Sequence, residues 1–199
     1  MKRGETTRSL ILAAGLDMAS LYGLEAVTIG SLAGKTRLSK SGLFAHFNSK
    51  ENLQIEILKH AEADFTASVI IPAVRIRAGI PRIKKLVDNW IEWGAKLTGG
   101  CVFVTAGVEY SDRPGKVRDY LLQQQRNWIG SLERVALSAV KCGDFRPDSD
   151  TQQFAFELYS LLLGFHLYHK LLNDPATRKR QETSLQTLLN RYTAVPEAA

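Results

Sequence analysis

Apolar residues recur at helical spacing along almost the whole chain, and this periodicity constrains the fold more than any other feature. One apolar face of a first helix, which Gly23 can end, is defined by Ile11, Ala14, Met18 and Leu21. No run of alternating β-branched residues has the length of a strand between turn signals. Further helices are separated by breaks at residues 79–81, 98–100, 113–115, 143–150 and 173–175. The sequence therefore predicts an all-α protein.

Two short helices are expected soon after the first. Thr28 is a suitable N-cap for a helix that runs to about Lys35. After a brief break, Ser39 can cap another short helix, in which Leu43 and Phe47 form the buried pair. Three short helices, the last two joined by a tight turn, are typical of a helix-turn-helix.

A longer helix is expected directly afterwards. Asn48 and Glu51 have the spacing of an N-cap and its N3 partner in a capping box. The helix should run to about Ile71, because Pro72 disfavours helical backbone in the residue before it. We place the domain boundary inside this helix, between residues 1–55 and residues 56–199, so that a rigid helix rather than a flexible linker joins the two halves.

Charge is distributed unevenly along the chain. Lys and Arg number 26 against 20 Asp and Glu, which gives a net charge of +6. Between Thr28 and Lys50 there is no acidic residue, whereas the basic residues there are Lys35, Arg37, Lys40 and Lys50. A surface that lies against phosphates requires such a lack of carboxylates. A solvated face would explain each basic residue singly, but the set at this spacing favours DNA binding.

Composition and motifs exclude several classes of protein. Two cysteines, Cys101 and Cys142, cannot build a disulfide framework, and a reducing cytosol suits such a chain. The most apolar stretch, residues 158–172, contains two histidines and a lysine and is too short to span a bilayer. No Gly-rich phosphate loop, GxSxG or HExxH motif is present. We expect a cytoplasmic protein that is not an enzyme, needs no cofactor or metal and does not enter a membrane.

The run LSKSGLFAHFNSKENL at residues 38–53 has a distinctive order, and Arg8, Gly23 and Thr28 precede it at characteristic spacing. Together these residues resemble the TetR family of transcription factors over roughly residues 8–58. The resemblance implies a helix-turn-helix DNA-binding domain at residues 1–55 and a larger helical domain for ligand binding and dimerisation at residues 56–199. The implied function is that of a transcriptional regulator, in most relatives a repressor, that a small-molecule effector releases from a palindromic operator on double-stranded DNA.

The resemblance also assigns roles in DNA binding. The helix from Ser39 to about Phe47 would be the recognition helix, whose N-terminal residues enter the major groove. Phe44 stands where the family usually has Tyr, so the ring is kept but a hydroxyl is lost. Arg37 stands in the turn where the family usually has Gly, and a positive φ there would be strained. The residues expected to contact DNA are Thr28, Arg37, Ser39, Lys40, Ser41, Gly42, Phe44, His46 and Lys50.

A seam with coiled-coil spacing near the C-terminus predicts a homodimer. It alternates steps of four and three residues through Phe154, Leu158, Leu161, Phe165, Tyr168 and Leu172. The same helix is apolar on another side as well, so it needs burial on both sides. The last helix offers Leu185, Leu188, Leu189 and Tyr192 at similar spacing. Two such pairs would form a symmetric four-helix interface and set two recognition helices about 34 Å apart. A central helix in a monomeric bundle is the alternative.

Aromatic residues gather in the middle of the chain. The family encloses a pocket for a small apolar or amphipathic molecule, and the resemblance implies that it is lined here by Trp90, Trp93, Phe103, Tyr110 and Trp128, with Glu109 as a polar anchor. Plain core packing is the alternative for these residues. A helical ligand-binding or redox-sensing protein, with Cys101 as the sensor and DNA binding secondary, is the other functional alternative, although a buried structural cysteine fits better. His166 and His169 share a helical face, where packing fits better than metal binding.

Overall fold

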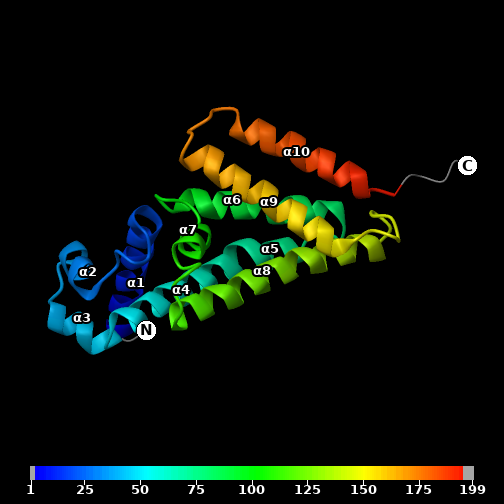
Figure 1. Ribbon diagram of the computed structural model, residues 1–199. Coiled ribbons are helices and arrows are strands. Elements are labelled where there is room, and N and C mark those ends of the chain that lie inside the picture. The colour runs from blue at the N-terminus through cyan, green and yellow to red at the C-terminus, as the bar shows by residue number, and fades with distance from the viewer. Residues whose placement is uncertain (1–2, 195–199) are drawn as a thin grey trace, which may run out of the picture. The chain divides into compact units, whose positions relative to one another are not determined.

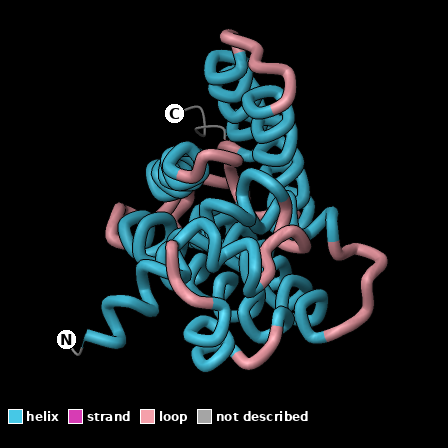
Figure 2. The backbone as a smooth tube through the Cα atoms, turned by 90° about the vertical axis from the view of Figure 1, so that its left-hand side faces the viewer, coloured by secondary structure: helices cyan, strands magenta, loops and turns pink. Residues whose placement is uncertain are grey.

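The computed structural model describes residues 3–194, with side chains from Thr7 onward. Figure 2 shows helices joined by short loops; within the described residues the only β pairing is a lone bridge between Phe145 and Thr193. The predicted all-α fold is confirmed. The helices are α1 (Arg3–Tyr22), α2 (Ile29–Thr36), α3 (Lys40–Phe47), α4 (Lys50–Phe65), the π-helix η1 (Thr66–Ile70), α5 (Ile71–Val74), α6 (Ile80–Lys96), α7 (Val102–Glu109), α8 (Lys116–Lys141), α9 (Thr151–Lys170) and α10 (Thr177–Tyr192). No helix in this part of the chain is both long and apolar enough to cross a membrane.

The chain forms two compact units. The first comprises residues 1–67 and 93–125, and the second comprises residues 68–92 and 126–199. The chain passes between the units inside helices each time, within η1, α6 and α8. The predicted domain boundary near residue 55 stays a prediction.

The first unit contains the helix-turn-helix. In it α1 packs against α2, α4 and α7, and α3 packs against α2 and α4 (Figure 1). Leu32, Leu43, Phe47 and Ile57, from α2, α3 and α4, are fully or almost fully buried in this core. Leu21, which the periodicity placed on the apolar face of α1, is instead 39% exposed, because it lies in the last turn of that helix.

The loop after α6 lies directly on the end of α1. A Cβ built on Gly99 would lie 1.7 Å from the backbone oxygen of Ser20, so only glycine allows this approach. The Gly99 N–H donates to Ser20 Oγ at 3.1 Å, and Thr98 Oγ1 donates to Asp17 Oδ1 at 2.7 Å. The predicted break at residues 98–100 is therefore a packing contact as well as a turn.

Local hydrogen bonds set the helix ends largely as predicted. Gly23, with φ +86°, ends α1, and the hydroxyls of Thr28 and Ser39 cap α2 and α3. The cap of α4 differs from the prediction, because Ser49 rather than Asn48 accepts a hydrogen bond from the N–H of Asn52. Asn48 instead has φ 62° and donates its N–H to the carbonyl of Phe44, so this residue ends the preceding helix.

The helix that begins at Lys50 continues farther than predicted. α4 passes into η1 and then into α5, which contains Pro72 in its first turn. The prediction that the helix ends before Pro72 is wrong: Pro72 directly follows the π-helix η1, where the hydrogen-bonding pattern of the helix changes. Within η1 the buried carbonyl of Val69 accepts a hydrogen bond from Asn89 Nδ2 at 3.0 Å. Asn89 therefore satisfies a backbone group beside the irregular turn.

The second unit is built around the helix pair α9 and α10. These helices lie side by side and run in opposite directions (Figure 1). Phe154 and Tyr192 pack edge to face with ring centroids 5.0 Å apart, and Phe145 joins them. Arg178 of α10 donates to Asp88 of α6 at 2.7 Å. Aromatic packing and this ion pair hold the last two helices in the unit.

Candidate nucleic-acid interface

The turn between α2 and α3 is closed by Arg37. Arg37 has φ 57° and ψ 27°, which is the left-handed conformation that the sequence analysis considered as a source of strain. This conformation costs a residue with a side chain roughly 1–2 kcal/mol. Leu32 and Ala33 on α2 and Leu43 on α3 are buried and the two helices pack against each other, which favours keeping Arg37 in this conformation.

One side of α3 is buried and the other is open. Leu43 and Phe47 are 0% and 2% exposed and face the core as predicted. The exposed residues of the helix and its cap are Ser39, Lys40, Ser41, Gly42, Phe44, Ala45 and His46. Phe44 is 56% exposed, although a ring of this size is normally buried. Six of the nine residues that the sequence assigned to DNA are thus exposed on α3 and its cap, whereas Thr28, Arg37 and Lys50 lie on neighbouring segments.

The hydroxyls of the two caps already hold backbone groups. Ser39 Oγ accepts a hydrogen bond from the N–H of Gly42 at 3.1 Å. Thr28 Oγ1 accepts one from the N–H of Ser31 at 3.0 Å, and Ser31 Oγ accepts one from the N–H of Thr28 at 2.9 Å. Each cap therefore fixes the start of a short helix whose remaining N–H groups form a favourable site for an anion.

Carboxylates from outside the basic segment reach two of its four cations. Lys35 Nζ lies 3.7 Å from Asp17 Oδ2 of α1, and Lys50 forms an ion pair with Glu25. Within the described residues, no ion pair links Arg37 or Lys40 to a carboxylate. The acid-free segment of the sequence is thus only partly acid-free in space, and sequence reasoning missed Asp17 and Glu25 because both lie upstream of it.

Glu109 holds the turn that precedes α2. Its two carboxylate oxygens accept hydrogen bonds from the N–H groups of Leu24 at 2.7 Å and Glu25 at 3.1 Å. Gly23 makes room for it, because a Cβ there would lie 2.9 Å from Glu109 Oε1. The predicted pocket anchor is therefore engaged with the DNA-binding part of the chain, a role that no signal near Glu109 in the sequence indicates.

Glu25 lies at the centre of a polar cluster beside this turn. Its carboxylate accepts hydrogen bonds from Lys50 and from the Tyr110 hydroxyl, the latter at 2.8 Å, and lies 3.5 Å from Arg113. The hydrogen bond from Lys50, followed by that from Tyr110, lowers the pKa of the Glu25 carboxyl. Burial and the hydrogen bond to Glu25 raise the pKa of Tyr110. A cavity of about 360 Å³ opens beside the cluster, with Gln54 and Arg118 also in its wall.

The predicted pocket residues do not share one compact unit. Trp93, Phe103, Glu109 and Tyr110 belong to the first unit, whereas Trp90 and Trp128 belong to the second. Trp93 stacks on Phe103 with centroids 6.1 Å apart, and the Trp93 indole N–H donates to Asp64 at 2.7 Å. The three tryptophans and Tyr110 are all at most 8% exposed. Their burial agrees with the core alternative, and a role in ligand binding stays a prediction.

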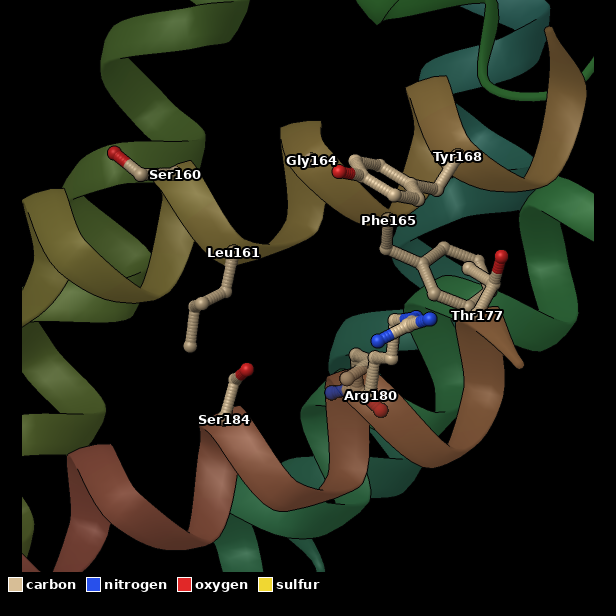
Figure 3. Close-up of a pocket in the computed structure, with 9 residues that line it drawn as sticks. Ser160, Leu161, Gly164, Phe165, Tyr168, Thr177, Arg180 and Ser184 are labelled. Carbon is tan, nitrogen blue, oxygen red and sulfur yellow. The ribbon is translucent and has the colours of Figure 1, made fainter. Parts of the chain in front are cut away.

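The predicted dimer seam is buried at one end of α9 and open at the other. Phe154 and Leu158 are buried within the unit, as are four residues of α10, namely Leu185, Leu188, Leu189 and Tyr192. Leu161 and Phe165 are half-buried, and Tyr168 and Leu172 are 44% and 54% exposed. Leu161, Phe165 and Tyr168 line a cavity of about 270 Å³ between α9 and α10. Figure 3 shows Leu161 and Phe165 pointing from α9 toward α10. A second cavity of about 480 Å³ adjoins it and shares Ser160, Leu161 and Ser184.

The structure gives little support to a redox site at Cys101 or a metal site at the two histidines of α9. Cys101 is 2% exposed, and burial raises the pKa of its thiol to about 11, so the thiolate that a redox sensor needs is disfavoured. His169 stacks on Phe165 with centroids 5.4 Å apart, and His166 is half-buried. Within the described residues, no group of three or more His, Cys, Asp or Glu side chains is placed to hold a metal ion.

Two short capped helices around a tight turn, with a basic and exposed second helix, define a helix-turn-helix DNA-binding protein. Comparison with family models agrees. Residues 11–57 match the model of bacterial regulatory proteins of the tetR family, and residues 79–185 match the tetracyclin repressor-like C-terminal domain. The chain belongs to the TetR family. It is thus a DNA-binding transcriptional regulator, in a family whose members bind operator DNA as homodimers and respond to small-molecule effectors.

Solved structures share this fold over nearly the whole chain. A TetR regulator from Chloroflexus aurantiacus has a TM-score of 0.86 at 19% identity, with 97% of this chain and 98% of that chain covered. One from Cytophaga hutchinsonii has a TM-score of 0.83 at 18% identity, with 98% of both chains covered. A putative regulator from Saccharomonospora viridis, solved in complex with choline, has a TM-score of 0.76 at 20% identity and covers 97% of this chain and 100% of that one. At these identities the likeness is one of fold. Among curated proteins, no match was found.

Proposed function

We propose that this protein is a repressor that binds a palindromic operator as a homodimer and is released from it by a small organic effector. The observation that carries the proposal is the open face of α3, where Lys40 and Phe44 are exposed on a helix whose other face is packed in the core. In this proposal residues 1–55 bind DNA, and residues 56–199 dimerise and bind the effector.

Contacts to DNA are proposed for the exposed side of the helix-turn-helix. Lys40 and Ser41, at the start of α3, would reach base edges or phosphates in the major groove. The ring of Phe44 would contact a thymine methyl group or a sugar. Phosphates would be held by Arg37, His46 and Lys50 and by the N-terminal N–H groups of the helices that Thr28 and Ser49 cap.

Dimerisation is proposed along α9 and α10. In the open part of the predicted seam, Phe165 and Tyr168 line the hollow between the two helices (Figure 3), and Leu172 is 54% exposed. A second copy is the simplest cover for these side chains, because symmetric dimers dominate among soluble oligomers. Two-fold symmetry would present two recognition helices and favour a palindromic site.

Release by an effector is proposed as a shift in population. A ligand that binds more tightly to the conformation with weak DNA affinity shifts the protein toward that conformation, and a coupling free energy of about 1–3 kcal/mol gives a useful response. The choline complex of the Saccharomonospora viridis regulator supports a small organic molecule as the class of effector. The proposed lining is the one expected from the sequence, with Glu109 as the polar anchor: Trp90, Trp93, Phe103, Tyr110 and Trp128.

Selection of bound sequences from random duplex DNA, followed by a salt titration on the selected site, tests this proposal. A palindrome of two half-sites is expected, and a reporter carrying it upstream of a promoter should be less active when the protein is present. Lys40→Ala should lower the affinity and reduce the slope of log K against log salt by about 0.9 for each phosphate that the lysine neutralises. Lys96→Ala, which removes a charge at the exposed end of α6, is the control. A single asymmetric site, or a reporter that becomes more active, would contradict the proposal.

A further inference from the structure

Lys50 has an anionic partner within its own chain. Its ammonium group forms an ion pair with a carboxylate oxygen of Glu25, which lies in the turn between α1 and α2. Both side chains are partly exposed, at 39% for Lys50 and 45% for Glu25. A DNA phosphate would compete with this carboxylate for the ammonium group.

Glu25 is held in place by groups other than Lys50. The Tyr110 hydroxyl donates to its second carboxylate oxygen at 2.8 Å, and Arg113 lies 3.5 Å from that oxygen. Its backbone N–H is bound by Glu109 at 3.1 Å. Gln54 Nε2, which is buried, donates to the carbonyl of Leu24 next to it at 2.9 Å. The carboxylate is therefore a fixed acceptor and not a freely moving surface charge.

We propose that Glu25 is a positioning residue for DNA binding: it occupies Lys50 in the free protein, and a phosphate must displace it before Lys50 can bind the DNA backbone. The proposal rests on the proposed role of Lys50 as a phosphate contact. Carboxylate and phosphate oxygens are alternative acceptors for an ammonium group. After the exchange Tyr110 and Arg113 still contact Glu25, so no carboxylate is left without partners.

The groups that share Glu25 come from a distant part of the sequence. Tyr110 follows α7 and Arg113 lies in the loop before α8, and both lie within the segment that matches the family's C-terminal domain model. A movement of this loop that separates Tyr110 or Arg113 from Glu25 would leave Glu25 with fewer donors besides Lys50. The exchange at Lys50 is thus sensitive to the conformation of the α7–α8 loop.

The experiment compares Glu25→Gln with Glu51→Gln in salt titrations on the selected operator. Both variants remove one negative charge, and Glu51, at 44% exposure, lies 3.8 Å from Lys116. Glutamine at position 25 keeps an acceptor for the Tyr110 hydroxyl. Glu25→Gln is expected to tighten DNA binding at low salt and to steepen the slope of log K against log salt by up to about 0.9 per subunit. Glu51→Gln should change the slope by clearly less.

Lys50→Ala in both backgrounds separates this inference from the role of Lys50. The loss of slope caused by Lys50→Ala should be larger in the Glu25→Gln background than in the wild type. An equal loss of slope in both backgrounds means that Lys50 binds phosphate independently of Glu25. Only the inference about Glu25 then fails. No loss in either background means that Lys50 does not hold phosphate, and the proposed contact fails as well.

Tyr110→Phe is an independent variant that should change DNA affinity in the opposite direction from Glu25→Gln. It removes one donor from Glu25, which then holds Lys50 more tightly, so weaker DNA binding and a shallower salt slope are expected. Tighter binding in Tyr110→Phe, or weaker binding in Glu25→Gln than in Glu51→Gln, overturns the inference. Circular dichroism and thermal melts establish that each variant is folded when it is measured.

Discussion

Arg37 shows how one residue can serve two requirements that conflict. The turn between α2 and α3 needs a left-handed backbone, which glycine adopts without strain, yet an arginine stands there with φ 57°. Its side chain is exposed and has no carboxylate partner within the described residues. A free guanidinium beside the proposed recognition helix suits a phosphate, and such a contact would explain why strain is tolerated in the free protein.

Arg37→Gly tests this explanation. The variant should unfold at a higher temperature, by the equivalent of about 1 kcal/mol, because glycine removes the left-handed penalty. It should also bind the operator less tightly and with a shallower salt slope, because glycine cannot bind a phosphate as the guanidinium does. Arg37→Asn, which loses the same charge but gains less stability, is the matched variant. A lower melting temperature for Arg37→Gly would show that the arginine side chain stabilises the turn.

At the scale of elements, the α7 terminus and the turn before α2 form one connected structure. Glu109, the last residue of α7, bonds the N–H groups of Leu24 and Glu25, which are 84 to 85 positions away in the sequence. Hydrogen bonds to a charged acceptor are stronger than neutral ones. The position of α2 therefore depends on an element that the C-terminal family model covers.

Glu109→Ala should lower the free energy of unfolding by about 2 kcal/mol, because two backbone donors lose a charged acceptor. Urea unfolding monitored by circular dichroism measures the change. Glu109→Gln, which keeps one acceptor oxygen, should lose less. Glu92→Ala, at an exposed position of α6, controls for the loss of a carboxylate. Equal stability for Glu109→Ala and Glu92→Ala would show that these hydrogen bonds contribute nothing.

At the scale of the whole molecule, the open end of the seam, at the end of α9, concerns assembly. Leu171 is 74% exposed and Leu172 54% exposed, and Tyr168 adds a third large side chain on the same part of the chain. Large exposed apolar side chains that cluster indicate a surface that another molecule covers. The proposed dimer makes stability depend on protein concentration, since association favours the folded state by mass action.

Leu161→Asp should convert the proposed dimer into monomers, because a carboxylate would be buried without a partner at the seam. Leu137→Asp places the same charge on α8, where Leu137 is 42% exposed, and should leave the dimer intact. Sedimentation velocity at several protein concentrations distinguishes the two variants. A Leu161→Asp dimer of unchanged stability would refute the proposed seam.

The sequence alone determined the helices, most of their ends and the helix-turn-helix, because these depend on interactions between neighbours along the chain. The Thr28 cap binds a backbone group three residues away, and Ser39 does the same. The limit of such local rules appears at Asn48 and Ser49. Both residues can cap, and the choice between them follows from where α3 ends.

Only the tertiary structure decided which charged residues form ion pairs and which apolar residues stay exposed. Glu25 reaches Lys50 across 25 positions and Tyr110 across 85, and no pattern in the sequence links these residues. The same holds for α9, where periodicity predicts an apolar seam. Periodicity does not reveal that Phe154 is buried in its own unit whereas Tyr168 is exposed. The physical reason is that an ion pair or a buried face depends on distances in space, which arise only once the helices have packed together.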